Sequence, residues 1–281
     1  MQKIILPWGM WYSNKILKLL PSKHWQVSTA ANFVYEKNNL PTIFKQCRFD
    51  ILKNRIEKMS PASIAIVVDD LTRPTPAYVV LPRLIRTLQK LGYNNDSLHI
   101  YPATGAHRPL QHSDLRKKIG NYALKHATIH HHSPFLNSLQ IGLTRCGAPI
   151  SINKSFTQCD FKICIGSVLP HVSARFSGGI KLIVPGLSSM DTIHHLHCCS
   201  ICKSSHDMRS ELDSIAQIIF IDFSLQIVCN PDGDIARVFG GDLQQAFMQA
   251  VKYLQNKIMI KVTTNNDVGI FNAYPFDTEF I

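Results

Sequence analysis

Short apolar runs alternate with amphipathic segments along this chain, and this alternation constrains its fold most strongly. Residues 63–69 (SIAIVVD) form a β-branched apolar run, which predicts a buried strand. Residues 76–91 begin with a proline and place apolar side chains on one face, which predicts a helix that ends at Gly92. The next expected elements are a strand over 97–103, a short helix over 110–119 and a strand over 161–168. This order predicts an α/β fold with a mainly parallel sheet flanked by helices.

The later part of the chain predicts an antiparallel hairpin in the same fold. Residues 218–229 are expected to form a long strand, residues 230–233 (NPDG) a turn, and residues 235–239 the returning strand. The other elements expected here are a helix over 211–217, a helix over 243–254 after the N-cap residue Asp242, and a strand over 258–262.

Composition limits the partners and the compartment that we expect. The 281 residues include 30 Lys and Arg against 19 Asp and Glu, a formal net charge of +11, which suits small anionic ligands. The basic residues are scattered without a dense block, so no nucleic-acid partner is expected. No apolar stretch approaches the roughly 18–20 residues of a membrane span, so no membrane partner is expected either. The eight cysteines lack the spacing of a disulfide framework, which predicts reduced thiols in a cytoplasmic protein.

Three polar loops follow three of the expected strands, at residues 70–76, 104–109 and 169–181. In an open parallel sheet, the loops after the strands' carboxyl ends line the ligand crevice. Polar residues that are far apart in the sequence are therefore expected to converge on one edge of the sheet.

These loops carry an arginine and two histidines. Arg73 lies in a proline-stiffened turn (DDLTRPTP), which suits capture of a carboxylate or phosphate; the alternative is a structural Arg–Asp pair. His107 lies in ATGAHR, and His171 lies at the start of PHVSARFSGGIKLIVPG, residues 170–186. Two histidines over one cleft can serve as base and acid on opposite faces of a ligand, which suits inversion of a stereocentre.

The third loop also carries a Ser-Gly-Gly turn followed by Lys181. Glycines let backbone N–H groups approach an anion without a Cβ in the way. A lysine just after such a turn can contact a phosphate or form a covalent bond to a carbonyl compound.

A histidine- and cysteine-rich run, MDTIHHLHCCSICKSSH, spans residues 190–206. Cys199 and Cys202 form one CxxC pair without a second, so a single soft-metal ligand from this run is favoured over a structural zinc site. The other dense cluster, residues 130–132 (HHH), is expected to be solvated or in a loop.

The motifs DxTRPTP, ATGxHR and PHxxARFSGGxKxxxPG occur in this order and together resemble the nickel-pincer lactate racemase family. The resemblance covers residues 1–257 as the family's N-terminal, cofactor-binding domain, and it implies that residues 258–281 begin a C-terminal domain. It implies an isomerase that racemises or epimerises a small-molecule 2-hydroxy acid. The implied cofactor is nickel in a nickel-pincer nucleotide, a pyridinium-3,5-bisthiocarboxylate mononucleotide covalently bound to Lys181. The implied partners are the proteins that make and insert this cofactor.

Roles of site residues follow from the same resemblance. His107 and His171 would be the acid/base pair, and Arg73 would bind the substrate carboxylate. His197 would ligate nickel, with His194 and His195 as close alternatives. The residues that would lie at the cofactor are Lys181, Asp70, Thr72, Ser177, Gly178 and Gly179. The implied reaction removes the hydroxyl proton, transfers hydride to the pincer ring, and returns both to a planar 2-oxo acid after it reorients.

The sequence departs from the family pattern at two places. Arg175 lies where lactate racemases carry glycine, which favours another 2-hydroxy acid such as a dicarboxylate, or marks a subgroup with unchanged chemistry. The sequence ends at residues 273–281 (AYPFDTEFI), where the family continues into a glutamine and a lysine that bind substrate. We therefore expect a truncated chain or one half of a split enzyme with a separate C-terminal half as partner, and hydride transfer that is weak or absent.

Two alternatives stay open from the sequence. The first is a truncated, non-catalytic binding domain of the same family. The second is a basic zinc-binding or nucleic-acid-binding protein, suggested by the net charge and the His/Cys run.

Overall fold

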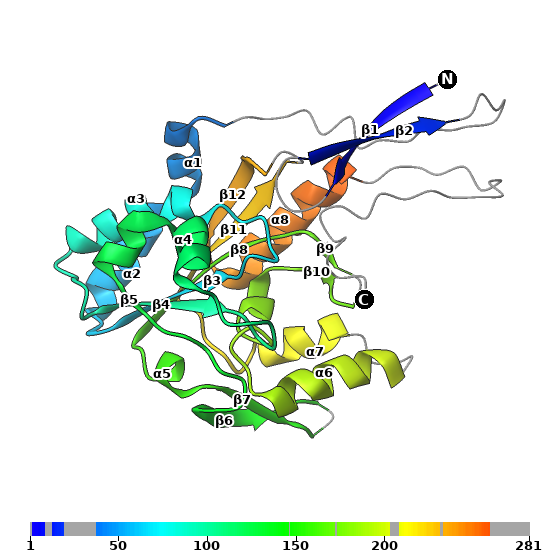
Figure 1. Cartoon of the computed structure of the whole chain (residues 1–281). Helices are drawn as coiled ribbons and strands as arrows, with labels where there is room; N and C mark the ends of the chain where they lie inside the picture. The colour runs from blue at the N-terminus through cyan, green and yellow to red at the C-terminus, as the bar shows by residue number, and fades with distance from the viewer. Residues whose placement is uncertain are drawn as a thin grey trace. The chain divides into compact units, whose positions relative to one another are not determined.

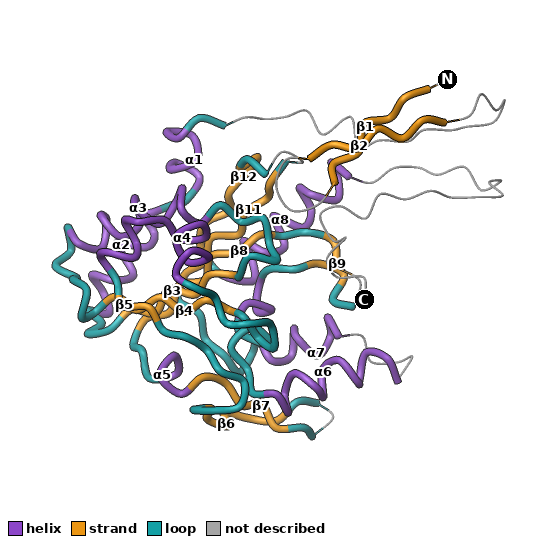
Figure 2. The backbone as a smooth tube through the Cα atoms, in the orientation of Figure 1, coloured by secondary structure: helices purple, strands orange, loops and turns teal. Residues whose placement is uncertain are grey.

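The computed structural model describes residues 2–8, 13–19, 38–145, 147–171, 173–202, 208–230 and 233–258 (Figures 1 and 2). Residues Tyr35–Asn256 form one compact unit. A second unit includes an antiparallel hairpin of β1 (Gln2–Trp8) and β2 (Ser13–Leu19), with Gln2 opposite Leu19 and Trp8 opposite Ser13. The site discussed below lies entirely within the larger unit.

A six-stranded sheet, in the order β12-β11-β8-β3-β4-β5, forms the centre of the larger unit (Figure 2). Its strands are β3 (Ile64–Asp69), β4 (Leu98–Ala103), β5 (Thr128–Ile129), β8 (Phe161–Ser167), β11 (Phe223–Cys229) and β12 (Ile235–Gly241). All neighbouring strands run parallel except β11 and β12, which form the late antiparallel hairpin. The fold class predicted from the sequence is therefore confirmed.

Helices and short strands pack around this sheet. The helices are α1 (Leu40–Gln46), α2 (Phe49–Met59), α3 (Ala77–Gln89), α4 (His112–His126), α5 (Lys154–Thr157), the 3₁₀ helix η1 (Gly179–Leu182), α6 (Met190–Cys202), α7 (Met208–Ile215) and α8 (Leu243–Ile258). The short strands pair as β6 (Ser138–Leu143) with β7 (Pro149–Asn153) and β9 (Pro170–His171) with β10 (Arg175–Phe176).

The core consists of two clusters, one on each face of the sheet. On β3, Ile64, Ile66 and Val68 belong to one cluster, whereas Ala65 and Val67 belong to the other. This alternation follows from the two-residue period of a strand, and it explains why β3 is buried along its whole length. The first cluster contains side chains of α1 to α4, and the second contains side chains of η1, α5, α6 and α7.

Most predicted elements are confirmed, and the two largest corrections of extent are a strand and a helix. The strand expected over 218–229 begins only at Phe223, because Ile218 and Phe220, which are 46% and 76% exposed, lie in the turn and the loop that precede it. The helix expected over 110–119 continues to His126 through a kink at Gly120, whose φ is +78°.

Four further predictions are confirmed only in part or lie partly outside the described residues. The strand expected over 258–262 is wrong at Ile258, which ends α8, and its other residues lie outside the described residues. Residues 259–281 of the predicted C-terminal domain start also lie outside the described residues, as do residues 231 and 232 of the predicted turn. The 130–132 cluster lies in a loop as predicted, but His132 is buried rather than solvated, because its Nε2 hydrogen-bonds the Ser188 carbonyl at 3.0 Å.

Within the described residues, no helix is both long and apolar enough to cross a membrane. The cytoplasmic location stays a prediction from the sequence.

Candidate active site

The three polar loops lie at the carboxyl ends of β3, β4 and β8, which are neighbours in the sheet. Because all three strands are parallel, these ends meet at one edge, as expected from the sequence. A direct bond joins two of the loops, since His107 Nδ1 lies 2.6 Å from an Asp70 carboxylate oxygen. Polar side chains from different loops therefore contact one another at this edge of the sheet.

Asp70 shapes the loop that carries Arg73. Its Oδ1 accepts hydrogen bonds from the Thr72 backbone N–H at 3.0 Å and from the Thr72 hydroxyl at 2.5 Å. Its carbonyl accepts a further bond from the Arg73 N–H at 3.3 Å. Aspartates form such turns readily because the short side chain reaches the backbone two residues ahead. Asp70 and Thr72, predicted to lie at the cofactor, thus also hold Arg73 in place.

A buried ion pair lies beneath this loop. Lys118 on α4, only 2% exposed, places Nζ 2.5 Å from Asp69 Oδ1 and donates a second bond to the Arg73 carbonyl at 2.8 Å. The other Asp69 oxygen accepts from the Ser167 N–H at 3.1 Å and from the Thr75 hydroxyl. Burial raises the pKa of the Asp69 carboxyl, and the Lys118 ammonium opposes that rise. The pair ties the ends of β3 and β8 to α4 and to the Arg73 loop.

Sequence reasoning missed this pair, although a signal was present. Lys118 lies three residues after Leu115 and one before Ile119, so it occupies the apolar face of the predicted helix. A lysine in that position needs a buried partner, which Asp69 at the end of β3 supplies.

The bond to Asp70 determines which ring nitrogen of His107 can accept a proton. Burial disfavours the Asp70 carboxylate, but hydrogen bonds from His107 and Thr72, together with nearby positive charge that includes Lys118, outweigh burial, so the pKa of Asp70 is lowered. The ionised carboxylate accepts from Nδ1–H of His107. The neutral ring therefore carries its lone pair on Nε2, the atom that can take a proton.

His171 carries its hydrogen on the other ring nitrogen, Nε2. Its Nδ1 accepts the backbone N–H groups of Ser173 and Ala174, each at 3.2 Å, so the neutral ring carries its hydrogen on Nε2. Burial, and then nearby positive charge, lower the pKa of His171 to about 3. The basic groups that lower it are Lys181, Arg73, His197 and Arg209. His171 is thus neutral near pH 7 and surrounded by cationic groups.

The glycines before Lys181 are required by packing. Gly178 and Gly179 both have positive φ, +82° and +59°. A Cβ on Gly178 would lie 2.8 Å from Gln226 Oε1, and that oxygen accepts the Gly179 N–H at 2.8 Å. Buried Gln226 on β11 thereby fixes the turn from which η1 starts and on which Lys181 lies.

Ser177 ties the same turn to the sheet. Its hydroxyl donates to the Ser167 carbonyl at 2.9 Å and accepts the Leu169 N–H at 3.0 Å. Ser177, Gly178 and Gly179, expected next to the cofactor, therefore form a rigid support for Lys181.

The His/Cys run contributes His197 to the cluster from α6. Its Nδ1–H donates to the Ile193 carbonyl at 3.0 Å, which leaves the lone pair on Nε2 unused by this bond. Burial lowers the pKa of His197, and the charges of Lys181 and His107 lower it further. His194 instead contacts Cys198, with Nε2 3.4 Å from Sγ. Within the described residues, no three His, Cys, Asp or Glu side chains are grouped as a ready metal site.

Arg209 was also missed by the sequence analysis. It lies on α7, is 9% exposed and places its guanidinium 4.8 Å from the centre of the Phe247 ring. No motif marks it, because its position depends on how α7 and α8 pack.

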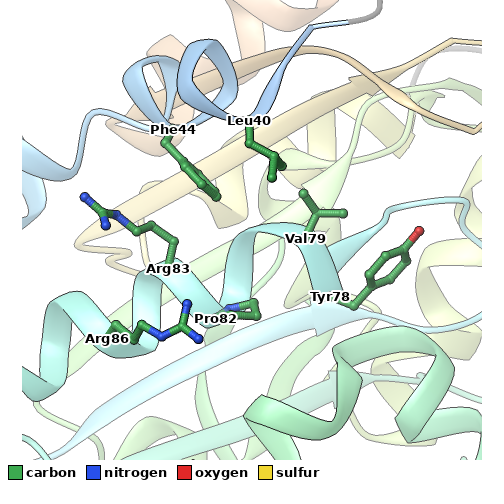
Figure 3. Close-up of a pocket in the computed structure, with 7 residues that line it drawn as sticks. All are labelled: Leu40, Phe44, Tyr78, Val79, Pro82, Arg83 and Arg86. Atoms are coloured by element: carbon green, nitrogen blue, oxygen red, sulfur yellow. The ribbon is translucent and has the colours of Figure 1, made fainter.

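A surface pocket of about 410 Å³ lies elsewhere, between α1 and α3 (Figure 3). Its lining residues are Leu40, Phe44, Tyr78, Val79, Pro82, Arg83 and Arg86. None of the predicted site residues lines it, so it is separate from the cluster at the sheet edge.

Comparison with known proteins gives the family. The family profile described as the lactate racemase N-terminal domain matches residues 12–209, and the chain belongs to this family. The lactate racemase of Lactiplantibacillus plantarum is 28% identical over 265 residues, which cover 89% of this chain and 62% of that protein. The lactate racemase of Thermoanaerobacterium thermosaccharolyticum is 26% identical over 227 residues, 76% of this chain and 53% of that protein.

Solved structures share the fold. The lactate racemase apoprotein of Thermoanaerobacterium thermosaccharolyticum superposes with a TM-score of 0.72 at 22% identity, covering 90% of this chain and 62% of that one. A protein from Thermotoga maritima gives a TM-score of 0.64 at 20% identity, and the match covers 81% of this chain and 61% of that protein. The chain thus spans about three fifths of the length of these relatives.

Proposed function

We propose that this chain is the cofactor-bearing domain of a 2-hydroxy acid racemase or epimerase. The observation that carries the proposal is the pair His107 and His171, held in opposite hydrogen-bonding states. A racemase that removes the hydroxyl proton of either enantiomer can use such a pair, one histidine for each orientation of the hydroxyl group, and the relatives named above are lactate racemases.

The residues present fit the nickel-pincer nucleotide as the cofactor. Lys181 would carry it covalently, on a turn that Gln226 and Ser177 make rigid. His197 would ligate nickel through Nε2, because Nδ1 is already bonded to the backbone. The basic groups around His171 suit the phosphate of a mononucleotide. When bound, this cofactor supplies a hydride acceptor that takes hydrogen from the substrate carbon and returns it.

The chain's own residues would bind the substrate and move its hydroxyl proton. Arg73 binds the carboxylate with a guanidinium whose loop is fixed by Asp70 and Lys118. His107 accepts the hydroxyl proton at Nε2, and the Asp70 carboxylate stabilises the resulting imidazolium. His171 donates a hydrogen bond from Nε2–H to the substrate oxygen. For His171 to act as the base, its Nδ1 must give up the two backbone hydrogen bonds. The His171 ring would therefore rotate when the two histidines exchange the roles of base and hydrogen-bond donor.

Loading of the cofactor requires partners. The proteins that synthesise and insert the nucleotide would have to reach Lys181 and His197 at the sheet edge. A 2-hydroxy acid is the proposed small-molecule partner.

Intact-mass analysis of the chain tests the proposal. The chain is co-expressed with the cofactor-making proteins, and we expect a mass adduct that peptide mapping places on Lys181. Lys181→Arg should abolish the adduct, whereas Lys162→Arg should keep it, because Lys162 bonds the Cys159 carbonyl, on the amino-terminal side of β8. Absence of the adduct, while the Thermoanaerobacterium thermosaccharolyticum lactate racemase loads in parallel, would refute the proposal.

A further inference from the structure

Arg175 has a backbone conformation that suits glycine better than arginine. Its φ is +60°, in the left-handed region where a Cβ crowds the following carbonyl. Three other non-glycine residues among those described have positive φ, and each has a local reason. Arg48 and Ser60 cap α2, and Asn137 belongs to a residue type that tolerates this region. Glycine would satisfy the hairpin at lower cost, so the Arg175 side chain needs another explanation.

The hairpin places Arg175 next to the proposed acid/base residue. In the pairing of β9 with β10, Arg175 lies directly opposite His171. Residues that face each other across an antiparallel pair have Cβ atoms roughly 5 Å apart. Arg175 is exposed and therefore accessible to a ligand, whereas His171 is half-buried.

The surroundings of His171 favour an anion with more than one charge. Arg73, in the loop that follows the neighbouring strand β3, is the residue proposed to bind one carboxylate. Arg209 adds positive charge at the same histidine. A second guanidinium, with its planar fork of donors, binds a second carboxylate bidentately.

We propose that Arg175 binds a second carboxylate and that the site therefore takes 2-hydroxy dicarboxylates. This substrate class rests on the function proposed above. Arg73 would hold the carboxylate beside the hydroxyl-bearing carbon, and Arg175 the carboxylate at the other end of the molecule.

Binding to the full chain without cofactor tests this inference. Dissociation constants for malate and lactate are measured by calorimetry at fixed ionic strength, for the chain and for Arg175→Gly. We expect the chain to prefer malate at least tenfold, about 1.4 kcal/mol, and the variant to lose that preference. Arg175→Gly should also raise the melting temperature by a few degrees, because it relieves the backbone conformation.

Two controls separate the guanidinium from simple charge. Arg116→Ala on the exposed face of α4 removes one positive charge elsewhere and should keep the malate preference. Arg175→Lys keeps the positive charge but lacks the planar guanidinium, so it should keep only part of the malate preference.

Several outcomes would overturn the inference. The first is that the chain binds malate and lactate equally, and the second is that Arg175→Gly keeps the preference for malate. The third is that Arg175→Gly loses affinity for nicotinic acid mononucleotide rather than for malate. The last result would assign Arg175 to a cofactor phosphate. Because the readout is binding without cofactor, it is independent of the Lys181 adduct, and either proposal can fail while the other stands.

Discussion

Replacing Lys118 with methionine removes the cation from the ion pair beneath the Arg73 loop and leaves Asp69 buried. Removing one partner of a buried pair costs about 3–5 kcal/mol, because the remaining charge is uncompensated. Asp69 keeps its bonds from Ser167 N–H and the Thr75 hydroxyl, so we expect a loss near the lower end, about 3 kcal/mol. For a chain of this size that loss lowers the melting temperature by roughly 6–12 °C.

The assay is urea unfolding followed by circular dichroism, for the chain, Lys118→Met and Lys117→Met. Lys117 is the exposed neighbour of Lys118 on α4, so its replacement should change the free energy of unfolding by less than about 0.5 kcal/mol. The double variant Asp69→Asn with Lys118→Met should recover part of the loss, because no charge is then buried alone.

The pH dependence gives a second readout for the same variant. Without Lys118, burial raises the pKa of folded Asp69 above its unfolded value. A carboxyl with a raised folded pKa destabilises the fold as pH rises through that value, so the deficit of Lys118→Met should shrink as pH falls towards 4. A loss under 1 kcal/mol that does not change with pH, or an equal loss in Lys117→Met, would refute this account of the pair.

Three further predictions concern the site and its support. Because the pKa of His171 is lowered to about 3, the folded state binds fewer protons than the unfolded state, so stability should fall as pH drops from about 6.5, and His171→Gln should weaken that dependence in urea titrations. Long-range ¹H–¹⁵N NMR at pH 7 should show the hydrogen on Nδ1 of His107 and on Nε2 of His171; the same tautomer at both would contradict the assigned roles. Gly178→Ala should destabilise by about 1–3 kcal/mol more than Gly233→Ala, since both have positive φ but only Gly178 is crowded. Equal losses at the two glycines would show that the contact with Gln226 is unimportant.

The sequence predicted the sheet and the edge where the site lies because those features depend on local patterns. The apolar runs that form β3, β4 and β8 can be recognised from residue type alone. The loops after them carry their polar residues in contiguous motifs, so Arg73, His107 and His171 can be named from the sequence.

What the sequence did not predict depends on contacts between distant segments. The Lys118–Asp69 pair joins residues 49 positions apart, and Gln226 meets Gly179 from 47 positions away. The apolar run over 218–229 predicted too long a strand, because Ile218 and Phe220 are apolar but face solvent. The burial of His132 likewise follows from its bond to Ser188, 56 residues later.

One carboxylate serves two parts of the proposed reaction at once. Asp70 shapes the turn that presents Arg73 through one oxygen, and orients His107 through the other. Substrate affinity and the position of the base are therefore mechanically linked. A substitution that shifts this turn to accept a different acid will also turn the His107 ring, so altered substrate choice and altered proton transfer should arise together in variants of this loop.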